Sequence, residues 1–73
     1  KSNVLKLRDP LVVKGDRAEF RAAIVRDGHV ELLRDEGSHM LHSLVHADVL
    51  AYVPENRRSY LKDDPIEVHW LPK

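Results

Sequence analysis

The sequence predicts a mainly β domain, a small β-barrel or β-clip of about five or six short strands with one short helix. Apolar and polar side chains alternate over several short segments, which is the period of a β-strand. The Asp27-Gly28 pair joins two of these segments, and an Asp-Gly pair is typical of a two-residue β-hairpin. The apolar period lengthens to about 3.6 residues only around residues 39–46, which indicates a single short helix.

The first strands are predicted at residues 11–13 and 18–26. The alternation in the second strand gives it two faces, one of which carries Phe20, Ala22 and Ile24. The hairpin turn at Asp27-Gly28 then returns the chain along residues 29–34. These elements form the best defined part of the predicted sheet.

Two further strands are predicted at residues 48–53 and 66–71, because each segment alternates and a proline-containing turn lies beside it. The aromatic residues on these strands are expected to be buried. We therefore interpret Tyr52 and Trp70, together with Phe20, as core residues rather than as platforms on which a ligand stacks.

The remaining segments are predicted to lie outside the regular structure. Residues 1–10 are interpreted as a connecting segment and not as a core element, because Asp9-Pro10 ends any regular element there. Residues 55–59 are polar and are predicted to form a loop. Residues 11–73 then constitute the folded domain.

Composition excludes several classes of function. The chain has 12 basic and 12 acidic residues and a formal net charge of zero, and the charges are interspersed, so nucleic acid is not an expected partner. No apolar run reaches the roughly 20 residues of a membrane span, so no membrane partner is expected. The absence of cysteine excludes disulfides and thiolate metal sites and is compatible with a reducing, cytoplasmic setting. We find no catalytic constellation, because a cysteine nucleophile and a glycine-rich phosphate loop are both missing.

The histidines offer a candidate metal site that we do not favour. His39, His42 and His46 share one face of the predicted helix, and neutral imidazoles with this spacing can bind zinc or nickel. No aspartate, glutamate or cysteine completes a ligand set on that helix. We therefore predict no metal site, and interpret this face as polar surface, exposed to solvent or to a neighbouring domain.

Several short motifs occur in the order found in a known family. They are Arg17-Ala18-Glu19-Phe20, Gly37-Ser38-His39, Ala47-Asp48 and Pro54-Glu55. With these motifs, residues 17–71 resemble the C-terminal domain of the molybdopterin molybdenumtransferases, the MoeA/gephyrin family.

The resemblance implies that residues 11–73 are a MoeA C-terminal-like β-barrel domain of a larger protein. The implied parent is a cytoplasmic homodimer of several domains that inserts molybdenum from molybdate into adenylylated molybdopterin with the help of Mg2+. The nucleotide and metal are held by other domains, so no cofactor and no catalysis by the isolated domain are expected. The alternative is a non-catalytic protein-interaction module derived from the same family.

The resemblance also points to Ser38, Gly37 and Arg17 as residues that bind substrate or an oxyanion. A Gly-Ser turn that opens a helix offers free backbone N–H groups, a hydroxyl and the positive end of the helix dipole, which suit molybdate or phosphate. Each residue also has a purely structural interpretation. Ser38 is an ordinary helix N-cap, Gly37 a joint with positive φ, and Arg17 one half of a surface ion pair with Glu19.

Two positions depart from the family pattern. A second arginine usually follows the aromatic residue by two positions, but Ala22 stands there, and Arg21 should project to the opposite face unless a bulge changes the register. Glu36 replaces a residue that is usually uncharged, and its carboxylate would repel molybdate. Arg21 and His39 are therefore only secondary candidates for oxyanion binding.

Overall fold

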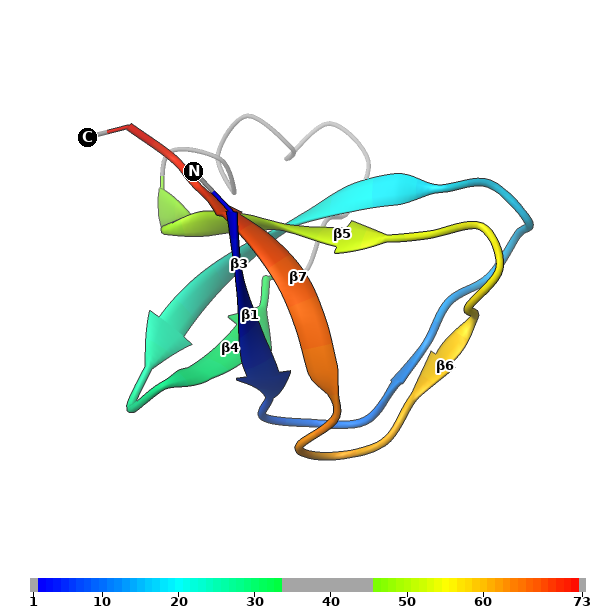
Figure 1. The fold of residues 1–73 in the computed structure, drawn as a ribbon, viewed down its shortest axis with the longest axis horizontal. Coiled ribbons are helices and arrows are strands. Elements are labelled where there is room, and N and C mark those ends of the chain that lie inside the picture. The colour runs from blue at the N-terminus through cyan, green and yellow to red at the C-terminus, as the bar shows by residue number, and fades with distance from the viewer. Residues whose placement is uncertain (1, 34–45, 73) are drawn as a thin grey trace.

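The computed structural model describes residues 2–33 and 46–72, and in them the chain forms a closed β-barrel with a small β-ribbon beside it (Figure 1). The strands are β1 (Ser2–Leu7), β2 (Leu11–Val12), β3 (Glu19–Arg26), β4 (His29–Leu32), β5 (Val49–Val53), β6 (Ser59–Tyr60) and β7 (Pro65–Trp70). The barrel order is β1–β4–β3–β5–β7, and β2 pairs with β6 in the ribbon. The mainly β prediction is confirmed. The helix predicted over residues 39–46 lies outside the described residues except for His46.

The hairpin between β3 and β4 forms at the predicted turn. Asp27 has a φ of 51° and Gly28 a φ of 76°. Positive φ at both central residues is what a type I′ turn requires, and it matches the right-handed twist of the flanking strands. Arg26 consequently faces His29 across the hairpin, which sets the register of the longest strand of the barrel.

Small and β-branched side chains fill the barrel. Alternate residues of the central strands point inward and are completely buried, for example Ala23, Val49, Ala51 and Val68. The core cluster comprises Leu7, Val13, Ala23, Val30, Val49, Ala51, Val53, Tyr60, Ile66 and Val68. A barrel with only five strands has a narrow interior, so alanine and valine fit where larger side chains would not.

The prediction that the aromatic residues are buried in the core is wrong for Phe20 and Trp70. Phe20 lies on the outer face of β3, whereas Trp70 pairs with the buried Val49 at the end of the inward face of β7. The exposed fractions of Phe20 and Trp70 are 53% and 42%, and Tyr52 is half-buried. Alternation defines two faces of a strand but does not say which one faces inward. On β3 the narrow interior accepts Ala23, and the face that carries Phe20 turns outward.

Strand β1 occupies the segment that we expected to be a connector outside the core, and this interpretation is wrong. It pairs antiparallel with β7 and parallel with β4, and Leu7 at its end is only 1% exposed. The strand ends just before Asp9-Pro10, as expected from the proline. The predicted polar loop also contains a short strand, β6, whose Tyr60 belongs to the core. Within the described ranges, no helix is long and apolar enough to cross a membrane.

Replacing Leu7 by alanine tests whether β1 is part of the core. Because the Leu7 side chain is buried, we expect Leu7→Ala to lower the free energy of unfolding by about 2–5 kcal/mol. Leu61→Ala is the matched control, since Leu61 is 72% exposed and its truncation should change stability by less than about 0.5 kcal/mol. Urea denaturation measures both variants. If both variants lost less than about 0.5 kcal/mol of unfolding free energy, residues 1–10 would behave as a connector.

Candidate functional site

The residues that the sequence suggested for oxyanion binding fall in two places. Ser38, Gly37 and His39 lie outside the described residues. Arg17 is exposed in the loop between β2 and β3. Among residues 2–33 and 46–72, no ion pair joins it to Glu19, so the proposed surface pair is not formed there.

Arg58 holds the loop that carries Arg17. Its Nη1 donates a hydrogen bond to the carbonyl oxygen of Gly15 at 3.2 Å, and its Nη2 donates one to the carbonyl oxygen of Pro54 at 2.8 Å. Gly15 has a φ of 89°, a conformation that favours glycine. One arginine therefore ties the chain before β3 to the chain after β5, and Arg17 projects from an anchored loop.

Arg21 and Ala22 face opposite sides of the barrel wall, as the alternation predicts. Arg21 pairs with Ala51, whose side chain is completely buried, whereas Ala22 pairs with the half-buried Leu50 on the outer face. The register between β3 and β5 runs without interruption from Glu19 to Ala23, so no bulge turns Arg21 outward. The outer position that holds arginine in the family pattern carries no charge here.

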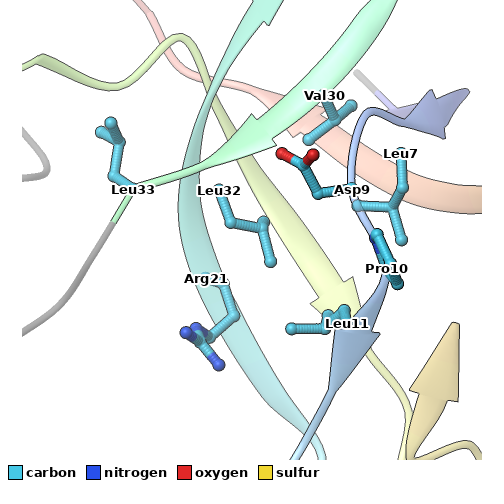
Figure 2. A pocket seen from close by; sticks show the side chains of 8 residues that line it. All are labelled: Leu7, Asp9, Pro10, Leu11, Arg21, Val30, Leu32 and Leu33. Atoms are coloured by element: carbon cyan, nitrogen blue, oxygen red, sulfur yellow. The ribbon is translucent and has the colours of Figure 1, made fainter. Parts of the chain in front are cut away.

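Arg21 instead lines a pocket of about 180 Å³ at one mouth of the barrel (Figure 2). The other lining residues are Leu7, Asp9, Pro10, Leu11, Val30, Leu32 and Leu33. They come from β1, the turn after it, β2, β4 and the residue that follows β4. Sequence reasoning missed this pocket because it treated residues 1–10 as a connector and expected Phe20, and not Arg21, on the inner side of β3.

An aromatic cluster covers the outer face of β3, β5 and β7. The ring of Phe20 lies 5.2 Å from that of Tyr52 and 5.8 Å, edge-on, from that of His69, measured between centroids. Nε2 of His69 lies 2.5 Å from a carboxylate oxygen of Glu67. Such contacts between rings contribute about 0.5–1.5 kcal/mol beyond the area they bury. Ala22 lies on the same face of β3 as Phe20 and pairs with Leu50.

The described histidines do not form a metal site. Nε2 of His29 lies 3.0 Å from Oδ1 of Asp63, within hydrogen-bond distance, and His46 is exposed. No group of three histidine, cysteine, aspartate or glutamate side chains in the described part of the chain is arranged to hold a metal ion. The interpretation of the face shared with His39 and His42 stays a prediction.

A charged network surrounds the buried Tyr60. The guanidinium of Arg57 lies 4.1 Å above the centre of the Tyr60 ring and donates a 2.7 Å hydrogen bond to Oδ2 of Asp64. The same carboxylate oxygen accepts the backbone N–H of Leu61 at 2.8 Å. Burial raises the pKa of the Tyr60 hydroxyl, and the charges of Arg57 and Arg58 only partly oppose this. The network fixes the loop before β7.

Comparison with known proteins identifies a family for nearly the whole chain. The family model described as the MoeA C-terminal region (domain IV) matches residues 4–71. A comparison with curated protein sequences gave no match.

Solved structures share the fold. A molybdopterin biosynthesis MoeA protein from Pyrococcus horikoshii OT3 superposes with a TM-score of 0.84 at 20% identity. A molybdenum cofactor biosynthesis protein from Pyrococcus furiosus superposes with a TM-score of 0.79 at 25% identity. Each match covers 97% of this chain but only 18% and 26% of the respective archaeal chains, which are therefore much longer.

The raised pKa of Tyr60 predicts an alkaline loss of stability. The neutral hydroxyl stabilises the folded state fully below the unfolded value of 10.0, and this contribution is lost as the pH rises through the higher folded pKa. Tyr60→Phe has no hydroxyl to ionise. We expect the free energy of unfolding of the wild type to fall more steeply than that of Tyr60→Phe between about pH 9 and pH 12. Urea denaturation at several pH values measures how the free energy of unfolding of each protein changes with pH. The difference in this free energy between the two proteins at pH 7 gives the effect of the lost hydroxyl on packing. Equal pH dependence of the two proteins would contradict a raised pKa of Tyr60.

Proposed function

The chain belongs to the MoeA C-terminal region (domain IV) family, and we propose that its parent protein inserts molybdenum from molybdate into adenylylated molybdopterin. The match of the family model over residues 4–71 is the observation that carries this proposal. In it the domain contributes to a cleft shared with other domains of the parent chain, which is a cytoplasmic homodimer. Molybdopterin, molybdate and Mg2+ are bound mainly by the other domains, and the 73-residue chain does not catalyse the reaction alone.

Within this cleft, Ser38, Gly37 and Arg17 are the proposed contacts with substrate or oxyanion. Exposure of Arg17 on a loop that Arg58 anchors supports its part of the proposal, since a cation held near one position loses less freedom on binding. His39 remains a secondary candidate. Arg21 is a poor one, because it faces the barrel mouth and not the side on which Ala22 lies.

A second candidate function is a non-catalytic protein-interaction module. The observation that favours it is the apolar outer face, where Phe20 is 53% exposed beside Tyr52 and no cation stands at Ala22. Exposed aromatic clusters are enriched at protein interfaces. Activity of the parent protein distinguishes the two candidates, because only the transferase requires an oxyanion site.

Substitution of Ser38 tests the transferase function. Because a Gly-Ser turn supplies hydrogen-bond donors to an oxyanion, Ser38→Ala in the full-length parent should lower the rate of molybdenum insertion by about tenfold or more. The same change should lower domain stability by only about 1 kcal/mol, the usual effect of a lost N-cap. Ser59→Ala, at the exposed position of strand β6, is the matched control and should keep full activity. If Ser38→Ala kept wild-type activity, Ser38 would have no role in oxyanion binding and would act only as a helix N-cap.

Substitution of Ala22 tests whether the lack of an arginine at this position limits the binding of molybdate by the isolated domain. Arginine at position 22 would place a guanidinium on the outer face beside Leu50, so Ala22→Arg should bind molybdate about tenfold more tightly than wild type. Isothermal titration at physiological salt measures both affinities. Ser59→Arg adds the same charge elsewhere and should leave the affinity unchanged. An equal gain in both variants would show a general charge effect and no site at position 22.

A further inference from the structure

We propose that the pocket at the mouth of the barrel binds a small zwitterion, a molecule whose carboxylate and amine are separated by a short apolar chain. The pocket, of about 180 Å³, is lined by six apolar residues, one arginine and one aspartate. Ligand sites in proteins typically combine an apolar wall with a few polar groups that fix orientation. The arginine, the apolar residues and the aspartate each specify one part of the ligand.

Arg21 supplies the site for the carboxylate. Its side chain is half-buried, and in Figure 2 the side chain of Leu11 points toward it. It makes no hydrogen bond or ion pair with any other residue in the ranges 2–33 and 46–72. A guanidinium that loses water without gaining a partner is unfavourable, and its planar set of N–H groups matches a carboxylate in a bidentate arrangement.

The apolar wall accounts for the chain between the charged groups. Leu7 and Val30 are each 1% exposed, and Leu11 and Leu32 pack against the core from the side of the pocket. Of these side chains, that of Leu32 lies between Arg21 and Asp9 in Figure 2. Methylene groups that contact this wall leave water, which stabilises the complex by about 0.8 kcal/mol for each CH₂ that is fully buried.

Asp9 supplies the site for the amine. It lies in the turn after β1, and its carboxylate points toward Val30 and away from the Arg21 guanidinium (Figure 2). It too has no hydrogen bond or ion pair with another described residue. A purely anionic ligand would be repelled by this carboxylate, whereas a ligand with a cationic group at its other end would be attracted.

Neither Arg17 nor Ala22 lines this pocket. Arg21 lies on the inner side of β3, and Ala22, at the family's arginine position, lies on the outer side. The two proposals are tested by different measurements, since zwitterion binding is measured on the isolated chain and molybdenum insertion on the full-length parent.

Binding of 6-aminohexanoate to the 73-residue chain tests the proposal, with backbone amide shifts in the NMR spectrum as the readout. At about 10 mM, tenfold above a millimolar dissociation constant, we expect saturating shifts that centre on Leu7, Leu11, Val30 and Leu32. Arg21→Gln should weaken binding about tenfold or more, through loss of the charge-assisted pair. Arg26→Gln is the matched control: Arg26 is exposed on the same strand beside the hairpin, and binding should be unchanged.

Hexanoate, which lacks the amine, tests the role of Asp9. It should bind the wild type several-fold more weakly than 6-aminohexanoate, and Asp9→Asn should remove the difference between the two probes. The amide spectrum of each variant also reports whether the barrel is folded. Absence of saturable shifts in the folded wild type, or equal affinity of wild type and folded Arg21→Gln, would overturn the proposal. Equal binding of both probes to the wild type would overturn the part assigned to Asp9.

Discussion

Closure of the barrel by β1 is the constraint on which the rest of the structure depends. The strand pairs parallel with β4 and antiparallel with β7, so it joins two strands that would otherwise be the open edges of a four-stranded sheet. Reciprocal backbone hydrogen bonds of 2.9 Å continue this closure past the strand, from Leu7 to Asp64 and from Asp63 to Leu7. A closed barrel leaves no strand edge for unwanted pairing. The closure also brings the turn after β1 over the barrel mouth, where it forms one wall of the pocket.

The narrow barrel determines which side chains are available for binding. Its interior accepts Ala23, Ala51 and the valines, and the larger Phe20 is left on the outer face. The outer face of β3 consequently presents an exposed aromatic ring at position 20. The same packing pushes the long Arg21 side chain to the barrel mouth, because a guanidinium cannot enter a dry interior without a partner.

Two neighbouring residues of β3 therefore lie on different surfaces of the domain. Arg21 faces the apolar pocket, and Ala22 lies among the aromatic residues of the outer face. Because strand side chains alternate, a one-residue displacement of an arginine moves its charge to the other side of the wall. The charge of Arg21 is therefore presented at the pocket and not on the outer face of β3.

The sequence alone determined the local elements and the family. Asp27-Gly28 specifies its turn through backbone conformation, and the alternation of β3, β5 and β7 is visible without any knowledge of their neighbours. The alternation in the sequence also predicted correctly that Arg21 and Ala22 face opposite sides of β3, because successive side chains of a strand alternate.

Only the tertiary structure decided which face of each strand is buried, and that residues 2–7 complete the barrel. Both depend on pairing between distant segments: β1 is held by β7, more than fifty residues away, and contains no strong local signal. The position of Phe20 outside and of Ala23 inside follows from the limited space within five strands, a property of the closed barrel and of no single segment. The pocket has the same origin, since its walls come from four strands and a turn that meet only after closure.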